Sequence, residues 1–562
     1  MREIKIFCEV CQGDRRELFI TAGSSLLELA EQMCVECELP VIAAFVNNRI
    51  KELSHRIYTT SLVRFVDITT FAGARVYQRT MQLVVQCAVE ELMPSRHIFI
   101  RHSMGVNGLY CEVEGVAGLA PLSDYEVYAI RDRVRQIVND NSPITREKLL
   151  TESVAKIYRQ RGYYDKVSLL ETRPRLFSEI YTLRGSVGYF YGSLAPSTGY
   201  VDLFEIEPYH SGFYVGLPCR NNPHRVSVSP NQTKMFNVFQ LHQRWVDIMG
   251  VQTVGALNEK IIKGDSGEMI KLAEALTERG LAEAADDIAA AHEERGCRMV
   301  LLAGPSSSGK TTTAKRLGVQ LQVLGYSPVL ISLDDYFVAR ELTPLDEFGE
   351  YDYEALEAID LRRFNENLGR LFAGESVDIP RYDFITGESQ LHKHPLSLND
   401  NSILIVEGIH GLNPRLTPEI DPALIYRVYA SCFTTIAMDN ASRIASADNR
   451  LLRRMVRDNT QRGANGERTL ARWESVRRGE ERHIFPYQEN ADRMINTALF
   501  YEISVLKPYA EKILREVPNT GVEFEEASRM LKFLDHFIEI SPDEIPPTST
   551  LREFIGGGSF VY

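Results

Sequence analysis

A glycine-rich segment near the middle of the chain has the residue types and spacing that bind nucleotide phosphates. Its sequence, GPSSSGKTT over residues 304–312, fits the pattern G-x-x-x-x-G-K-[ST]. Glycines let backbone N–H groups approach phosphate oxygens, and the helix that follows adds the positive end of its dipole. We therefore expect ATP to bind here through its phosphates. The residues expected to contact it are Gly304, Ser306, Ser307, Ser308, Gly309, Lys310, Thr311 and Thr312.

Two carboxylates are expected beside this loop. Asp334 follows an apolar run that ends at Leu333, and Glu407 directly follows the run Ile403–Val406. The carboxyl ends of parallel strands form the ligand-binding edge of a sheet, so both side chains can reach the phosphates. Asp334 is predicted to accept the proton of an attacking hydroxyl, and Thr311, Asp334 and Glu407 are predicted to hold Mg²⁺. The alternative for Asp334 is an acidic turn that caps a helix.

Three arginines form another cluster, within the sequence DNRLLRRMVRD at 448–458. Arg450, Arg454 and Arg457 are spaced i, i+4 and i+7, which places them on one face of a predicted helix. Guanidinium groups suit the charge that develops on a transferring phosphoryl group. Lys310, Arg454 and Arg457 are therefore predicted to act in catalysis, and Arg450 in nucleotide binding. A solvent-exposed basic face is the alternative for these arginines.

These residues need a scaffold that brings them to one edge, and the apolar pattern of residues 298–515 predicts it. Met299–Ala303 is a continuous apolar run, as expected for a strand that is buried on both faces. Further apolar runs at 329–333, 403–406 and 424–429 follow at the intervals of a βαβ pattern. We expect an α/β fold here, with a doubly wound parallel sheet that carries the P-loop.

The motifs of residues 298–512 together resemble the uridine kinase/phosphoribulokinase family of P-loop kinases. The segments that carry the resemblance are GPSSSGKTT, SLDDYF, EYDYEALEAID, IPRYDFITGES, ILIVEGIHGLN and DNRLLRRMVRD. The resemblance implies an ATP- and Mg²⁺-dependent phosphotransferase in which Asp334 is the general base for a nucleoside 5′-hydroxyl. It also implies that Tyr336, Glu354, Tyr382 and Phe384 bind the nucleoside.

Two positions depart from the uridine kinase pattern. Those kinases usually carry Asp in an N-F-D-H-P segment that holds the ribose, and Glu354 stands at that position here. They also carry a His after Y-D-F that contacts the pyrimidine, and Gly387 stands there. Neither change touches phosphoryl transfer, but both bear on a preference for uridine. A sugar phosphate or another small alcohol is the alternative acceptor.

The amino-terminal half has a different pattern. Residues 1–70 alternate in the order ββαββ of a β-grasp fold, with a helix predicted from Leu26 to Cys37, and they resemble the TGS domain. Residues 71–228 read as mixed α and β. They resemble the editing-type second domain of threonyl-tRNA synthetases, through YQRT at 77–80, QCA at 86–88 and GYVDLF at 199–204.

The residues that form the editing site of those synthetases are replaced here. Arg79 and Leu83 stand at the paired histidines, and Phe204 and Tyr209 at the later Cys and His. Arg, Leu and Phe neither bind a metal nor shuttle a proton near neutral pH. We therefore expect no editing activity. RNA binding through this half, or a regulatory role, is compatible with the substitutions.

Two cysteine pairs have a spacing that is typical of zinc sites. They are Cys8-x-x-Cys11 and Cys34-x-x-Cys37, and in a β-grasp layout the end of the first strand and the end of the helix lie on the same side. Against zinc, Cys8 and Cys37 fall on inward-facing positions, where cysteine acts as a small buried hydrophobe. Both interpretations stay open.

Composition sets the limits on the whole chain. With 562 residues, 44% hydrophobic and 25% charged, several globular domains are expected. The formal net charge of −13 argues against a chain that coats nucleic acid as a whole. No apolar run is long enough for a membrane span, and nine cysteines without a secretion signal favour reduced thiols in the cytoplasm. Residues 229–297 read as a helical connector or an extra layer on the next domain, and 516–562 as a C-terminal extension.

Two classes of function follow from these motifs. The leading interpretation is a nucleoside kinase, since Asp334 and the aromatic segment around Tyr382 suit catalysis on a small acceptor. The other class is an ATP-gated protein that binds RNA or regulates a partner through its first 225 residues. Such a switch would hydrolyse ATP with no small acceptor present. The sequence does not predict an oligomeric state.

Overall fold

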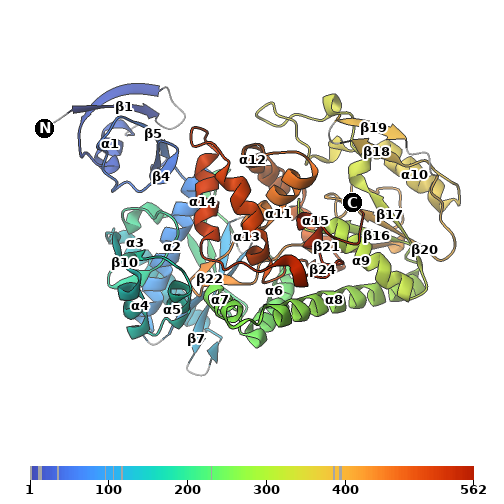
Figure 1. The fold of residues 1–562 in the computed structure, drawn as a ribbon, viewed down its shortest axis with the longest axis horizontal. Coiled ribbons are helices and arrows are strands. Elements are labelled where there is room, and N and C mark those ends of the chain that lie inside the picture. The colour runs from blue at the N-terminus through green and yellow to red at the C-terminus, as the bar shows by residue number, and fades with distance from the viewer. Residues whose placement is uncertain are drawn as a thin grey trace.

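The computed structural model describes residues 3–9, 15–34, 37–94, 96–104, 107–115, 118–119, 121–228, 231–383, 386–391 and 395–561. A mixed sheet at the N-terminal end lies far from the sheet that carries the P-loop (Figure 1). No helix among the described residues is both long and apolar enough to cross a bilayer.

The N-terminal sheet contains the strands expected from the alternating pattern and one more. Its elements are β1 (Glu3–Glu9), β2 (Arg15–Thr21), α1 (Leu26–Met33), β3 (Ala43–Val46), β4 (Arg49–Lys51) and β5 (Ser61–Val66). The strand order is β2-β1-β5-β3-β4, with β1 and β5 parallel at the centre. A capping box between Ser25 and Glu28 begins α1, whose Leu26 and Leu29 are buried against the sheet. The short strand β4 was not predicted.

The next region combines a long buried helix with two larger antiparallel sheets and the two-stranded sheet β14-β15. Its helices are α2 (Phe71–Leu92), α3 (Asp124–Asn139), α4 (Thr151–Gln160) and α5 (Tyr164–Glu171). One sheet has the order β12-β13-β7-β6 and the other β11-β10-β9. The strands are β6 (Ile98–Met104), β7 (Gly108–Gly115), β8 (Gly118–Leu119), β9 (Thr145–Leu150), β10 (Phe177–Leu183), β11 (Ser186–Gly188), β12 (Glu205–Tyr209), β13 (Gly212–Gly216), β14 (Pro218–Cys219) and β15 (Asn222–Val226).

Three helices precede the P-loop sheet, and the last of them belongs to its covering layer. The helices are α6 (Thr233–Met249), α7 (Val254–Lys263) and α8 (Ser266–Arg295). The second half of α8 packs Leu281, Ala285 and Ile288 against Leu317 of α9 (Lys310–Val323) and against the P-loop sheet. Figure 1 shows α8 running along one side of the molecule towards that sheet. The extra-layer interpretation therefore holds for α8.

The P-loop sheet is parallel, as the apolar runs predict. Its strands are β16 (Met299–Ala303), β17 (Ser327–Ser332), β20 (Ser402–Glu407), β21 (Ile425–Ser431) and β24 (Arg493–Asn496), in the order β17-β20-β16-β21-β24. One face is covered by α8 and α9, and the other by α10 (Leu361–Phe372). Every residue of β16 is buried, which explains its uninterrupted apolar sequence.

The remaining elements lie outside this sheet. They are β18 (Pro380–Asp383), β19 (Glu388–Leu391), β22 (Ala437–Asp439), β23 (Ser442–Arg443), α11 (Ser446–Gln461), α12 (Gly466–His483), α13 (Glu502–Arg515), α14 (Phe524–Leu534) and α15 (Arg552–Ile555). The end of the chain is more closely packed than its glycine-rich sequence predicts. Leu551 and Phe554 are buried in the core formed with α11 and α13, and Ser559 N–H donates to Pro547 O.

Candidate active site

The phosphate-binding loop connects β16 to α9 in the expected strand–loop–helix order. Ser307 and Gly309 have positive φ values of 58° and 81°, which turn the chain sharply into α9. The hydroxyls of Ser307 and Ser308 are buried and have no hydrogen-bond partner among the described residues. Buried hydroxyls without partners are costly, and at a helix N-terminus they suit an anion. The loop therefore fits phosphate oxygens.

Gly304 is the residue of this loop that steric contacts constrain most clearly. A Cβ at this position would overlap the carbonyl oxygen of Ala430 in β21. We expect Gly304→Ala to destabilise the protein by about 1–3 kcal/mol and to weaken ATP binding. Urea unfolding and ATP titration would measure both effects. Gly369→Ala is the matched control, because Gly369 lies in α10 with open space around its Cβ position. Equal stability of both variants would contradict the expectation.

Glu407 ends β20 beside the start of α9. Its Oε1 accepts hydrogen bonds from Thr311 Oγ1 at 3.3 Å and from Ser332 Oγ at 2.8 Å. Burial, followed by the charge of Asp334, raises the pKa of Glu407 to about 7, while Lys310 opposes the shift. Carboxylate and hydroxyl oxygens are suitable ligands for Mg²⁺. The structure thus brings together Thr311 and Glu407, two of the three residues predicted to bind the metal.

Lys310 and Asp334 lie in the same charged group. Lys310 Nζ donates to Pro305 O at 3.2 Å, and burial lowers the pKa of Lys310. The charges of Glu407, Asp334 and Glu553 oppose that lowering, which places all three carboxylates near the ammonium group. Asp334 lies in the turn directly after β17, at the carboxyl edge of the sheet. The predicted base and metal ligands therefore gather beside the loop.

Arg450 supports the loop from within the protein. It is 2% exposed and forms a bidentate ion pair with Glu480 of α12, at 2.7 Å between its NH2 and Oε2. Arg450 NH1 also donates to Ser306 O at 3.1 Å, and Ser306 N–H donates to Glu480 Oε1 at 3.2 Å. A guanidinium that is already paired with a carboxylate is a poor partner for phosphate. The structure therefore places Arg450 as a support of the loop backbone, where a direct phosphate ligand was predicted.

Arg454 and Arg457 lie closer to the loop's open side. Arg454 NH1 donates to Ser306 Oγ at 2.8 Å, and both arginines pair with Asp458, at 3.3 Å and 3.1 Å respectively. Burial lowers the pKa of Arg454, and the charge of Arg457 adds to this effect. The charge of Arg457 also acts on Lys310. Together the two guanidinium groups carry more positive charge than the single carboxylate of Asp458 neutralises. The remaining positive charge suits the binding of a phosphoryl group.

The predicted acceptor residues are only partly brought together. Tyr336 is 1% exposed, packs against Phe364 and accepts a hydrogen bond from Asn367 Nδ2 at 3.0 Å, so its ring and hydroxyl already have partners within the protein. The ring lies in the core between the P-loop sheet and α10, the helix that contains Phe364 and Asn367. Tyr382 lies in β18 and contacts Phe337. Glu354 lies beside Gly479 of α12, and Phe384 is outside the described residues.

Residues predicted from the amino-terminal resemblances have structural partners. Arg79 donates to Ser193 O at 3.1 Å, and Leu83 is fully buried. Phe204 lies under the guanidinium of Arg135, and Tyr209 packs beside Phe236. None of these contacts involves a group that suits proton transfer.

The cysteine pairs are incompletely described. Cys8 and Cys34 are free thiols, and burial raises their pKa values to about 12 and about 11. Cys37 is disulfide-bonded, and Cys11 lies outside the described residues. Across the part of the chain that is described, no group of three or more His, Cys, Asp or Glu side chains is placed to hold a metal ion. The described thiols fit burial better than zinc binding, which needs thiolates.

Comparison with known proteins assigns this region to a family. A model of the phosphoribulokinase/uridine kinase family matches residues 299–503. These residues form a domain of that family. Over 195 residues the chain is 29% identical to the uridine kinase of Staphylococcus aureus (strain JH9), covering 34% of this chain and 84% of that kinase. Membership of the family supports a P-loop kinase of a small substrate.

Two solved structures are also similar to the kinase-family domain. A putative fructose transport system kinase from Silicibacter sp. TM1040 is 18% identical, with a TM-score of 0.28, and the match covers 38% of this chain and 98% of that one. A possible uridine kinase from Bacillus stearothermophilus is 18% identical, with a TM-score of 0.25, and the match covers 36% of this chain and 89% of that one.

The C-terminal segment lies outside the matched residues yet contacts the phosphate-binding loop of the kinase-family domain. Glu553 of α15 accepts a hydrogen bond from Thr312 Oγ1 at 2.6 Å, and its side chain is buried. The methyl group of Thr550 lies next to Gly309. Sequence patterns did not indicate this contact, because Glu553 is 241 residues from Thr312 and belongs to no motif.

Glu553 places a negative charge where a triphosphate must approach. We expect Glu553→Gln to bind ATP more tightly, by roughly tenfold, because the amide oxygen still accepts from Thr312 while the repulsive charge is removed. Isothermal titration with ATP would measure the change. Glu544→Gln, at an exposed position of the same segment, is the control. Weaker ATP binding by Glu553→Gln would show instead that the carboxylate orders the loop.

Proposed function

We propose that this protein is an ATP- and Mg²⁺-dependent kinase that transfers the γ-phosphate of ATP to the 5′-hydroxyl of a nucleoside. The observation that carries the proposal is the assembly of Lys310, Glu407 and the partnerless hydroxyls of Ser307 and Ser308 at one sheet edge, with Asp334 beside them. A nucleotide-binding loop alone would need no carboxylate at the position of Asp334.

The residues present fit ATP and Mg²⁺. The loop hydroxyls and Lys310 would hold phosphate oxygens, and Thr311 and Glu407, with Asp334, would supply hard oxygen ligands for the metal. When bound, Mg²⁺ supplies neutralisation of charge on the phosphates. Arg454 and Arg457 would stabilise negative charge on the transferring group, and Asp334 would accept the proton of the attacking hydroxyl. Such catalysis depends on positioning and charge stabilisation.

A nucleoside acceptor is supported by the likeness to uridine kinases. It is also supported by the positions of Glu354, beside Gly479 of α12, and of Tyr382, in β18. A sugar phosphate is the second candidate, and one contact favours it. The guanidinium of Arg340 fills the space where a side chain at Gly387 would lie, at 2.9 Å from that Cβ position. Arg340 also interacts with Tyr382. An arginine at the position of the family's histidine suits an acceptor that carries a phosphate.

The acceptor can be identified by incubating the full chain with ATP, Mg²⁺ and separate panels of nucleosides and sugar phosphates. We expect a nucleoside 5′-monophosphate to form, and we expect Lys310→Ala to form none. Conversion of a sugar phosphate with no nucleoside converted would establish the second candidate. Conversion of neither would contradict a small-molecule kinase.

The pKa of Glu354 predicts how binding of the acceptor depends on pH. Burial raises the pKa of Glu354 to about 7, with Arg454 opposing and Glu480 adding to the shift. The charged carboxylate accepts hydrogen bonds from the acceptor's hydroxyls more strongly than the protonated acid does, so KM for the acceptor should fall as pH rises through about 7. Glu354→Gln should have a KM that is independent of pH over this range and about tenfold higher at pH 8. The same pH dependence in wild type and variant would show that another group titrates.

The same pKa shift affects stability with a defined sign. The folded protein holds the Glu354 proton at higher pH than the unfolded chain does, so the contribution of this group to stability falls as pH rises from about 4.5 to about 7. Glu354→Gln should remove that loss, which urea unfolding at several pH values would detect.

A further inference from the structure

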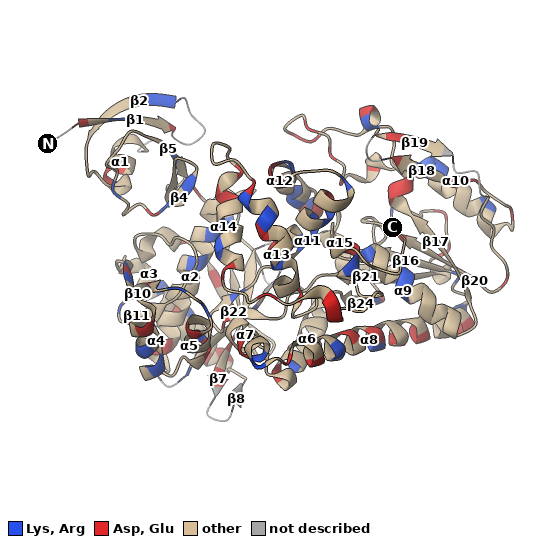
Figure 2. Ribbon diagram, viewed as in Figure 1, with Lys and Arg blue, Asp and Glu red and all other residues tan. Residues whose placement is uncertain are grey.

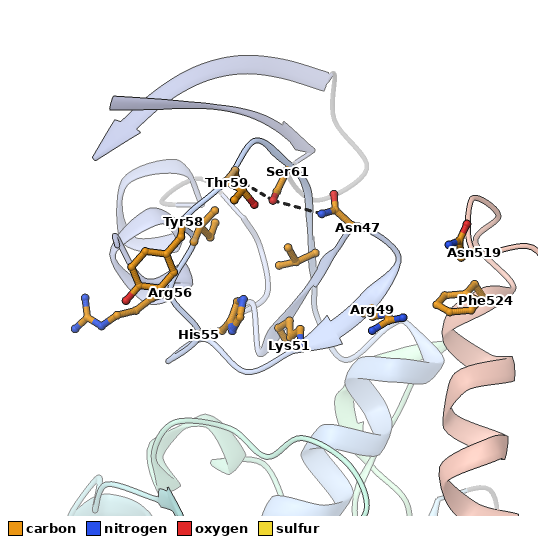
Figure 3. Close-up of a pocket in the computed structure, with 12 residues that line it drawn as sticks. Asn47, Arg49, Lys51, His55, Arg56, Tyr58, Thr59, Ser61, Asn519 and Phe524 are labelled. Carbon is orange, nitrogen blue, oxygen red and sulfur yellow. Dashed lines mark hydrogen bonds between the residues drawn. The ribbon is translucent and has the colours of Figure 1, made fainter. Parts of the chain in front are cut away.

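A cavity lies far from the phosphate-binding loop, between the N-terminal sheet and α14. Its volume is about 550 Å³, within the range of small-molecule sites. Three segments that are distant in sequence form its walls: residues 46–51, residues 55–61, and the stretch from Asn519 to Phe524. Figure 3 shows the side chains of the N-terminal sheet on one side and those of Asn519 and Phe524 on the other.

The lining of this cavity is basic in a chain whose net charge is −13. Arg49, Lys51, His55 and Arg56 line it, and no Asp or Glu does. Arg49 and Lys51 colour most of β4 blue in Figure 2. Most arginines of the kinase-family domain pair with carboxylates, but within the described ranges no ion pair neutralises Arg49, Lys51 or Arg56. Positive charge that no carboxylate neutralises is therefore concentrated here, although Arg56 NH1 donates to Gly23 O at 2.7 Å.

Cations next to the cavity strengthen this field. Burial lowers the pKa of His55, and the charges of Lys51 and Arg146 add to the effect. The charges of Lys51 and Arg146 likewise act on Lys532 of α14, whose pKa is lowered chiefly by burial. The nearest carboxylates of α14 are already engaged, because Glu525 and Glu526 pair with Arg75. Arg146 is itself paired with Glu52 and Glu179, and Glu179 also acts on Lys532, so the charge available to an anion is that of the lining residues.

The lining also offers surfaces for a planar ring. Tyr58 is 65% exposed at the rim. Arg49 lies over the ring of Phe524, with its Cζ 5.2 Å from the ring centre. Asn47 and Ser61, which are hydrogen-bonded to each other at 3.4 Å, add polar groups to the wall. Exposed aromatic and guanidinium planes beside cations are the features that bind a base together with its phosphate.

We propose that this cavity binds a nucleoside phosphate, either as a free nucleotide or within a single strand of RNA. The shared chemistry is a phosphate held by Arg49 and Lys51 and a base stacked on Tyr58. Arg56 adds positive charge beside Tyr58, where its NH1 donates to Gly23 O at 2.7 Å. Because α14 supplies one wall, the site exists only where the N-terminal sheet and the C-terminal extension meet. The proposal does not depend on the kinase activity, since no residue of the phosphate-binding loop takes part.

Fluorescence anisotropy of a labelled, short single-stranded RNA of mixed sequence tests the proposal on the full chain. We expect Arg49→Ala/Lys51→Ala/Arg56→Ala to weaken binding at least tenfold. The slope of log Kd against log salt concentration should also fall, by about 0.7 for each phosphate contact that is lost. Lys51→Glu alone should weaken binding as well. Thermal unfolding would verify that the variants are folded, since the replaced side chains lie at the surface.

The controls separate this site from general charge and from the kinase site. Lys156→Ala/Lys263→Ala/Lys271→Ala removes three exposed cations elsewhere and should leave binding unchanged. Lys310→Ala should also bind the RNA normally, whatever its effect on ATP. If nucleoside 5′-monophosphates compete with the RNA, the ligand is a free nucleotide. If they do not compete, the ligand is a single strand of RNA. The proposal is overturned if the control triple variant loses as much affinity, if the cavity variants lose none, or if neither probe binds.

Discussion

Asp334→Asn is expected to lower kcat about a thousandfold, while the Kd for ATP changes by less than about tenfold. Asparagine keeps the size and polarity of the side chain but cannot accept the proton of the attacking hydroxyl. The charge of Asp334 acts on both Lys310 and Glu407, which places its carboxylate beside the phosphate-binding loop. Steady-state rates with saturating ATP and acceptor, together with ATP titrations, would separate the two effects.

Asp335→Asn is the matched comparison. Asp335 is the adjacent carboxylate, and its Oδ1 accepts from Tyr382 N–H at 3.4 Å, so it positions β18. We expect this variant to lose less than about tenfold in kcat. A near-normal rate for Asp334→Asn with a large loss for Asp335→Asn would transfer the role of base to Asp335.

Glu480→Gln is expected to destabilise the protein by about 3–5 kcal/mol, because it leaves the charge of Arg450 buried without a carboxylate. Arg450 and Glu480 are 2% and 0% exposed, and together they bind the backbone N–H and C=O of Ser306. The loss should therefore include ATP binding as well as stability. Urea unfolding with and without ATP would measure both.

The control for this variant lies on the same helix. Glu474 of α12 is 54% exposed and pairs with Arg220 at 3.5 Å and with Arg478 at 3.7 Å. Exposed pairs of this kind contribute about 0–1 kcal/mol, so Glu474→Gln should be nearly as stable as wild type. If Glu480→Gln were equally mild, the pair would not support the loop.

The site residues that could be predicted from the sequence are those whose positions follow from the order of neighbouring strands, loops and helices along the chain. A strand, a glycine-rich loop and a helix place Lys310 and Thr311, and the ends of apolar runs place Asp334 and Glu407 at the same edge. Parallel pairing of β16 with β20 brings Leu302 opposite Glu407, so the register alone carries this carboxylate to the loop. No distant contact is needed for these positions.

The residues that were missed or misjudged depend on contacts between distant segments. The helical spacing of Arg450 correctly placed it near the loop, but its buried partner Glu480 lies 30 residues away and carries no motif. Tyr336 lies two residues after the predicted base, and only its packing against Phe364 shows that its ring points into the core. Glu553 reaches the loop from the C-terminal segment, 241 residues along the chain from Thr312.

The fate of the phosphate of γ-labelled ATP tests the central claim most directly. With the full chain, Mg²⁺ and a nucleoside, we predict that the label appears on the nucleoside 5′-monophosphate and that little inorganic phosphate forms without an acceptor. Release of labelled inorganic phosphate at the same rate with and without every acceptor would contradict a phosphotransferase and would indicate an ATP-driven switch.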